Sequence, residues 1–419
     1  WKIVLPYHLL LFKNLKIRKL SKRDAKQYNE LFRYAFQVTI SELNSLGWKE
    51  DEIQRTKSPI IENANVIGWF DERKLVSQIC VYPMEMNIHN EIYKIGGVTG
   101  VATYPEYSGL GLMHSLMKKS LENMRKSGQY FSVLCPYSIP FYRKKGWEII
   151  SDTMEYQIKD TQLPKKHNVD GMVERVPDNS EDIKIVHDKF FLQRHGVLKR
   201  NELEWNEYWK WESDDVITAV YYNRKDEPTG YIVYYLENEI FKIKELVYLN
   251  IEAYYGIWNY IANHFSMITE VKGYNYTNDP ISFFLEDGDI QETIKPNVMG
   301  RIVDFEQFIK KYPFKSISIH NNLHFQITDP MLECNNGDFE VFWDKDGEIH
   351  VDKKIGVGYN EDTDGELVKT DIQTLSALFM SYKTATYLKN TERLIASKKA
   401  VRILEEIIPS EQPYFSDYF

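Results

Sequence analysis

The chain has 419 residues, of which 43% are hydrophobic and 27% charged, and Lys plus Arg total 52 against 61 Asp plus Glu, a net charge of −9. This length exceeds one ordinary hydrophobic core, so we expect two or three domains. The acidic balance and the lack of a basic block argue against binding to nucleic acid, and no apolar run reaches the roughly 20 residues that a membrane-spanning helix needs.

Residues 1–14 begin without methionine, and we interpret them as a leader outside the fold, either disordered or foreign to the natural chain. From residue 15 to about 160 the pattern predicts the order β-α-β-β-β-α-β-α-β. Ser21 and Asp24 resemble a capping box before the first helix. The predicted apolar face of that helix comprises Tyr28, Leu31, Phe32, Ala35 and Phe36. We interpret the acidic segment Glu42–Glu52 as an ordinary charged helix rather than a surface for a cationic substrate.

The segment GVATYPEYSGLGLMHSLMKKSLENMRKSG, residues 100–128, joins a predicted strand to an amphipathic helix through glycines. Glycine lets a ligand approach the main chain, and the first N–H groups of a helix attract an anion such as phosphate. The dinucleotide fingerprint GxGxxG fails because His114 stands three residues after Gly111, and no GKS or GKT completes a P-loop. A phosphate-binding loop and a glycine-rich turn that binds nothing both remain open.

Two further units follow the first. Residues 161–180 are polar and contain two prolines, which predicts a linker. Residues 218–265 repeat the strand–strand–helix order, and only Gly256 remains of the glycines at the equivalent junction. We predict a degenerate duplicate over 161–295 that has lost its ligand loop, although any strand–strand–helix run would look similar. Residues 296–419 alternate strands and helices and are predicted to form a third unit.

Aromatic residues and cysteines add two expectations. The 29 Tyr, 21 Phe and 9 Trp favour either thick aromatic cores or an aromatic-lined pocket. Cys80, Cys135 and Cys334 lie far apart and form no CxxC pair, which predicts no disulfide framework and a cytoplasmic location. Cys135 follows a predicted strand, and we interpret it as a buried structural thiol. No His, Cys, Asp or Glu cluster has the spacing of a metal site, so we expect no metal.

Four features resemble the enhanced intracellular survival (Eis) acetyltransferases of the GNAT superfamily. They are the segments GVATYPEYSGLGLM, PYSIPFYRKKGWE and IKPNVMGRIVDFEQFI, and the aromatic C-terminal residue Phe419. The resemblance covers nearly the whole chain. It implies an α/β (α+β) architecture of a normal GNAT domain over 15–160, a degenerate GNAT domain over 161–295 and a sterol-carrier-like domain over 296–419. It also implies assembly as a homohexamer.

The resemblance further implies which residues form the active site. Tyr142 would be the proton donor, and the carboxylate of Phe419 would be the proton acceptor. Contacts to acetyl-CoA are implied for Val101, Ala102, Thr103, Ser108, Gly109, Leu110, Gly111, Leu112, Met113, His114, Tyr137 and Ser138. The chain departs from the family pattern at Ser108 and Gly109, where arginines are usual, and at Tyr137, where a small hydroxyl residue is common. His114 is included for its backbone only.

The chemistry of acetyl transfer suits these residue types. A backbone N–H near Val101–Thr103 can polarise the thioester oxygen as its charge develops. A tyrosine, with an ordinary pKa of about 10, is protonated at pH 7 and can act as a general acid. A terminal carboxylate has a pKa of about 3.3–3.7 and is a poor base in water. Burial beside the substrate would let it accept a proton or hold the amine through a water.

We therefore predict an acetyl-CoA-dependent N-acetyltransferase that modifies primary amines of a cationic acceptor, either an aminoglycoside-like molecule or a lysine side chain. Acetyl-CoA is the expected cosubstrate, and neither nucleic acid nor a membrane is an expected partner. Two alternatives stay open at this point. One is an acyltransferase with another acyl donor or acceptor, and the other is a non-catalytic protein that senses CoA and carries a lipid.

Overall fold

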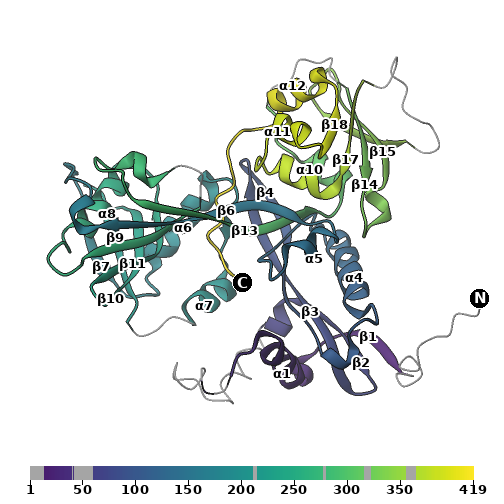
Figure 1. The fold of residues 1–419 in the computed structure, drawn as a ribbon, viewed down its shortest axis with the longest axis horizontal. Coiled ribbons are helices and arrows are strands. Elements are labelled where there is room, and N and C mark those ends of the chain that lie inside the picture. Colours follow the sequence, from purple (N-terminus) through teal and green to yellow (C-terminus); the bar gives the residue numbers. More distant parts are fainter. Residues whose placement is uncertain are drawn as a thin grey trace, which may run out of the picture.

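The computed structural model describes residues 14–39, 41, 60–210, 215–276, 280–315, 322–354 and 365–419. The predicted leader, up to residue 13, and the acidic segment Glu42–Glu52 lie outside these residues. The chain forms three lobes, and its C-terminus lies at the centre, between the lobes (Figure 1). Each lobe corresponds to one of the three units predicted from the sequence.

The first unit has the predicted order of elements. In sequence these are β1 (Leu15–Lys19), α1 (Ala25–Phe36), β2 (Asn65–Asp71), β3 (Lys74–Ile88), β4 (Glu91–Thr103), α4 (Leu112–Lys126), β5 (Phe131–Leu134), α5 (Ile139–Arg143) and β6 (Glu148–Lys159). The strands β1 to β5 are neighbours in order, as in a meander that ends in one crossover. The predicted capping box of Ser21 and Asp24 is present, and the carboxylate of Asp24 accepts a hydrogen bond from the backbone N–H of Ser21 at 2.8 Å.

Strands β4 and β5 pair over a short stretch and then diverge. They pair in parallel only where Ile95–Gly97 faces Phe131–Val133. Beyond Gly97, β4 continues to Thr103 and pairs with β3, whereas β5 ends at Leu134. In the part of the chain that the structure describes, no strand pairs with the backbone edge from Val98 to Thr103 on the β5 side. An extended ligand could pair with this edge as another strand would.

The second unit continues the same sheet. Its elements are β7 (Met172–Val176), α6 (Glu181–Gln193), β8 (Leu198–Lys199), α7 (Glu202–Lys210), β9 (Ile217–Tyr222), β10 (Pro228–Glu237), β11 (Ile240–Tyr248), α8 (Ile251–Ala262), β12 (Glu270–Asn275) and β13 (Gln291–Ile302). Within the described residues, the strands from β1 to β7 form one 13-stranded sheet, because β13 lies between β5 and β6 and β12 pairs with β6. The first two units thus share a backbone-paired frame.

Three details of the second unit differ from the expectations. The stretch 161–180 is not only a linker, because β7 within it pairs with β9 at the edge of the sheet. The boundary expected between 295 and 296 falls inside β13, whose register with β5 and β6 ties it to the large sheet. Gly256 lies inside α8 rather than in the loop before it. A Cβ there would lie 2.1 Å from the ring of Tyr221, so helix packing explains this glycine.

The third unit has its own sheet. Its elements are α9 (Phe305–Lys310), β14 (Leu323–Thr328), β15 (Gly337–Trp343), β16 (Ile349–Lys354), β17 (Glu366–Asp371), α10 (Ile372–Phe379), α11 (Ala385–Asn390), β18 (Leu394–Ala396) and α12 (Lys398–Ile407). The strand order is β16-β15-β14-β17-β18. After α12 the chain has no regular structure and runs as a tail, residues 408–419, to the centre of the molecule (Figure 1).

Candidate active site

The glycines before α4 lie in a loop with open space around its backbone. Gly109 and Gly111 have φ angles of +79° and +73°, which side-chain-bearing residues rarely adopt, and a Cβ at either would meet no atom within 4 Å. The glycines are therefore not needed to fit packed neighbours. The N–H groups of residues 109–114 donate no hydrogen bond within the described part of the chain. The loop and first turn of α4 thus present bare amides to solvent, as an anion-binding loop requires.

A lysine from another segment lies beside this loop. Lys145 Nζ is 3.0 Å from Nδ1 of His114, in the first turn of α4. Burial, together with the positive charges of Lys145 and Lys118, lowers the pKa of His114. Ser108 carries no charge where the family has arginine, but Lys145 brings a cation to the same helix end. Lys145 follows α5 and is remote from the loop in sequence, so no local sequence pattern indicates this contact.

The other predicted cosubstrate contacts lie on either side of the parting strands. Val101, Ala102 and Thr103 end β4, and the Ala102 side chain is buried, so a ligand would meet this segment through its backbone. Tyr137 and Ser138 follow β5, with the Tyr137 side chain exposed and Ser138 preceding α5. The structure therefore brings the predicted strand edge, loop and α5 start around one opening of the sheet.

Tyr142 projects from α5 into packed surroundings. Its side chain is buried and contacts the rings of Phe141 and Trp147 edge-on. Burial, with smaller contributions from Cys135 and Tyr137, raises the pKa of Tyr142 to about 12. Its hydroxyl has no hydrogen-bond partner among the described residues. The group is thus protonated at neutral pH and available to a ligand atom.

The C-terminal residue lies at the point where β4 and β5 part. An added Cβ at Gly97 would lie 2.9 Å from Cε2 of Phe419, which shows how closely the phenyl ring approaches β4. The backbone of Phe419 lies beside the thiol of Cys135 and opposes the burial that raises the pKa of this thiol to about 12. Cys135 is also a neighbour of Tyr142. The two predicted catalytic groups therefore flank one thiol at the end of β5.

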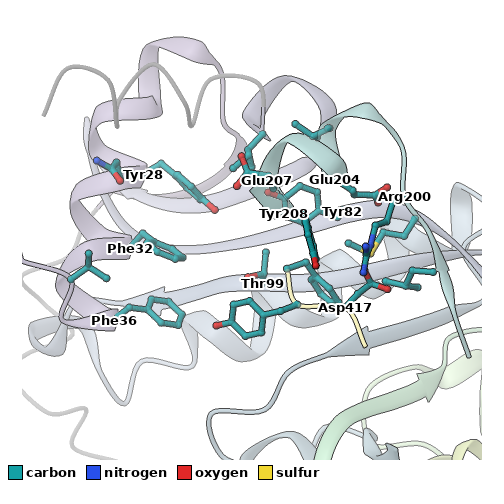
Figure 2. A pocket seen from close by; sticks show the side chains of 18 of the residues that line it. Tyr28, Phe32, Phe36, Tyr82, Thr99, Arg200, Glu204, Glu207, Tyr208 and Asp417 are labelled. Atoms are coloured by element: carbon teal, nitrogen blue, oxygen red, sulfur yellow. The ribbon is translucent and has the colours of Figure 1, made fainter. Parts of the chain in front are cut away.

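A cavity of about 590 Å³ extends from this point between the first two units (Figure 2). Aromatic side chains form much of its wall, whereas many other aromatic side chains are buried in the hydrophobic cores, so both interpretations of the aromatic content apply. In α1, the predicted apolar face divides: Tyr28 and Leu31 are buried, whereas Phe32 and Phe36 line the cavity, and Phe36 is exposed. The lining aromatic residues are Tyr28, Phe32, Phe36, Tyr82, Tyr208, Tyr418 and Phe419.

Carboxylates and cations both line the cavity. Glu204 and Glu207 from α7 and Asp417 from the tail stand beside the cationic side chains of Arg33, Lys199 and Arg200. Oε1 of Glu204 is buried without a hydrogen-bond partner, and burial, opposed by the backbone N–H of Asn201, raises the pKa of Glu204 to about 7. A buried carboxylate oxygen without a donor is costly unless a ligand supplies one. Glu204 Oε1 therefore offers an acceptor for a hydrogen-bond donor of a ligand, such as an ammonium group, beside the apolar wall of the cavity.

Comparison with known families agrees with this geometry. Residues 16–150 and 196–302 each match a model of an acetyltransferase (GNAT) domain, and residues 305–416 match a sterol carrier protein domain. The chain is a GNAT N-acetyltransferase. Its order of two GNAT domains and one sterol carrier protein domain is the Eis-like architecture that the sequence motifs indicate. No curated protein matches the chain in sequence.

Solved structures resemble the chain over its full length. A protein of unknown function from Enterococcus faecalis V583, described as a probable N-acyltransferase, has 26% identity and a TM-score of 0.87, covering 97% of this chain and all of its own. A GCN5-related N-acetyltransferase from Anabaena variabilis has 23% identity, a TM-score of 0.82 and the same coverage. Eis1 from Mycobacterium abscessus shares the fold at 16% identity, with a TM-score of 0.77 and again the same coverage.

Two searches of the described residues bear on other classes of function. None of their helices combines the length and the apolar character that crossing a membrane requires. No group of three or more His, Cys, Asp or Glu side chains among them is arranged to hold a metal ion.

Proposed function

We propose that the protein transfers the acetyl group of acetyl-CoA to a primary amine of a cationic acceptor bound in the cavity. The observation that carries the proposal is the position of Phe419, where β4 and β5 diverge and where the aromatic-lined cavity begins. A donor held along β4 and an acceptor held in the cavity would meet at this point. The acceptor classes are an aminoglycoside-like molecule and a lysine side chain.

The donor fits the loop and the strand edge. In this proposal the bare amides of residues 109–114 bind the pyrophosphate, and Lys145 contributes the charge that Ser108 lacks. The open edge from Val98 to Thr103 pairs with the pantetheine. The open space at Gly109 and Gly111 is compatible with this assignment, because a ligand can lie directly against the backbone there.

The reaction then needs two proton transfers. The amine nitrogen attacks the thioester carbonyl carbon, a C–N bond forms and the C–S bond breaks. Backbone N–H groups at the end of β4 stabilise the charge on the carbonyl oxygen. Tyr142 donates its proton to the departing thiolate, and the carboxylate of Phe419 accepts the proton that the amine loses, directly or through a water. The products are an amide and CoA.

The acceptor is held by charge and by apolar contact. Glu204 and Glu207 would pair with its ammonium groups, and the rings of α1 would contact its carbon atoms. The test is incubation with acetyl-CoA and a panel of aminoglycosides, polyamines and lysine-containing peptides. We expect free thiol to appear together with an acceptor that is heavier by one acetyl group for each amine modified. Thiol release that no acceptor increases would overturn the proposal.

We also propose that the chain assembles as a cytoplasmic homo-oligomer, a hexamer by its resemblance to the Eis acetyltransferases. Light scattering of the purified protein would give the mass of the assembly. A monomer at micromolar concentration would contradict this part of the proposal without affecting the proposed chemistry.

A further inference from the structure

We propose that Arg200 of the second unit positions the C-terminal carboxylate of Phe419 in the active site by holding Asp417. The second GNAT unit would thereby complete the active site of the first, although its own strand-to-helix junction has no glycine loop. This inference rests on the proposed role of the terminal carboxylate. Arg200 and Asp417 are positioning residues in it, because neither is assigned a contact with the reacting atoms.

Arg200 lies at the centre of a buried ionic cluster. Its side chain is 2% exposed, and its guanidinium donates two hydrogen bonds to Glu245, at 2.6 and 3.1 Å. Its remaining Nε donates to Oδ1 of Asp417 at 2.6 Å. Glu245 has further donors, because the hydroxyls of Tyr208 and Tyr231 also reach its Oε2. The Arg200–Glu245 pair is therefore satisfied within the second unit, and Asp417 is the addition that comes from the tail.

Asp417 is held less completely than Glu245. Its Oδ2 is buried and has no hydrogen-bond partner. Burial raises the pKa of Asp417, and Arg200 opposes that shift. One arginine thus faces two carboxylates. A buried carboxylate with a single partner is weak evidence for stability, since its desolvation offsets the attraction. A role in fixing the position of the tail explains why the group is there.

The position of Asp417 along the tail supports this role. Upstream, the tail is tied by Tyr414 N–H to the carbonyl of His195 at 2.8 Å, and by Asn297 Nδ2 to the carbonyl of Phe415 at 3.0 Å. The four residues after Phe415 can span about 13–14 Å. The two residues after Asp417 can span only about 7 Å. The ion pair therefore halves the length of tail that is free to move.

Beyond Asp417, weaker contacts fix the position of the terminus. The backbone of Phe419 lies beside the sulfur of Cys135, a weak acceptor, and its ring packs against Gly97. The neighbouring side chain of Tyr418 is 86% exposed. A proton acceptor must lie within hydrogen-bond reach of the amine, so loss of the ion pair should displace the carboxylate without dismantling either unit.

The test compares Asp417→Ala and Asp417→Asn with the wild type. Both variants leave the neutral Arg200–Glu245 pair intact, whereas a change at Arg200 would strand Glu245 and risk misfolding. The first measurement is the rate at which carboxypeptidase A releases Phe419 from the folded protein. We expect release to be at least 10-fold faster in Asp417→Ala and intermediate in Asp417→Asn, because asparagine keeps a neutral acceptor for Arg200.

The second measurement is steady-state kinetics with an accepted amine. We expect kcat to fall at least 10-fold in Asp417→Ala, with the affinity for acetyl-CoA unchanged. Glu411→Gln is the matched control, since it removes another ion pair of the same tail, Arg194–Glu411 at 3.5 Å, that lies near the surface. It should change neither quantity.

Three results separate this inference from the proposed function. If carboxypeptidase A releases Phe419 from Asp417→Ala at the wild-type rate, the proposal that the Arg200–Asp417 ion pair holds the tail is overturned, whatever the value of kcat. Faster release with an unchanged kcat would overturn the positioning role. Full turnover of a chain that lacks Phe419 would instead overturn the catalytic role of the terminal carboxylate. The release assay on the full-length chain would then still test whether the Arg200–Asp417 ion pair holds the tail.

Discussion

The phenyl ring of Phe419 packs against the backbone of Gly97, although 321 residues separate them in the sequence. Gly97 is the last residue of β4 that pairs with β5. The end of the third unit therefore lies at the opening of the first unit's sheet. A side chain at position 97 would collide with Phe419 and with Met84. Residues of the first and third units thus meet at the candidate active site.

A residue added after Phe419 should therefore inactivate the enzyme. It would move the terminal charge by about 3.3–3.6 Å, which exceeds a hydrogen bond of about 2.6–3.2 Å. We expect a C-terminal affinity tag to reduce kcat by roughly 100-fold or more, the range of a lost general base, while acetyl-CoA binding survives. The same tag at the N-terminus is the control. Full turnover of the C-terminally tagged protein would transfer the base role to an internal residue or a water.

Tyr142→Phe should reduce turnover and leave binding intact. The change keeps the ring packing against Trp147 but removes the hydroxyl proton, and we expect kcat to fall by roughly 100-fold or more. Calorimetry should give nearly the wild-type affinity for acetyl-CoA. Tyr387→Phe makes the same chemical change at an exposed tyrosine of the third unit and should have little effect. An unchanged kcat in Tyr142→Phe would leave Tyr142 with a packing role only.

Gly111→Asp should abolish acetyl-CoA binding. The side chain would enter the open space at the loop, and its charge would repel the phosphates, at a residue whose φ is +73°. Gly128→Asp is a matched control, because Gly128 follows the other end of α4 with the same φ of +73° and open surroundings. Ser108→Arg should tighten binding severalfold by adding a cation. Equal binding by both aspartate variants would show that the loop is assigned to the wrong ligand.

Local sequence patterns were enough for the first unit but not for the acceptor cavity. The order of elements from residue 15 to 160 follows from hydrophobic periodicity, and the loop follows from its glycines. Glu204 and Arg200 had no such signal, since their segment, KRNELEWNEYWKW, looks like an ordinary acidic helix. They reach the site because β13 and β12 flank β6 and bring the second unit alongside the first. The tail ending PYFSDYF was a usable signal for Phe419, but not for the partner of Asp417.

The second unit should bind no acetyl-CoA of its own. Asn250 caps α8, with its side chain accepting a hydrogen bond from Ala253 N–H at 2.9 Å, so the helix start is partly satisfied by the chain itself. The nearest glycine, Gly256, packs directly against the ring of Tyr221, so its backbone is not open to a ligand. Titration calorimetry should give one acetyl-CoA per chain for the wild type. Gly111→Asp should remove that one event. Two binding events per chain would show that the second unit is active.

Two stacked histidines join the three units. The rings of His89 and His195 lie 3.7 Å apart between centroids. Each ring also reaches the third unit, His89 Nε2 through Ser381 Oγ at 3.1 Å and His195 Nε2 through the carbonyl of Met380 at 3.1 Å. Burial lowers the pKa of His89 to about 2 and that of His195 to about 4. Both rings are therefore neutral in the folded protein at pH 7.

Acid should weaken this junction. A folded-state pKa below the ordinary value of about 6.5 means that the unfolded chain binds more protons below pH 6.5. The stability from the neutral rings is fully present above pH 6.5 and is lost as the pH falls toward 4. We expect Tm to drop steeply between pH 6.5 and 4.5, and less steeply in His89→Asn, because asparagine tolerates the φ of +50° there and does not titrate. His350→Asn, at an exposed histidine, should keep the wild-type slope. If His89→Asn also keeps it, the buried pair is not the source of the acid sensitivity.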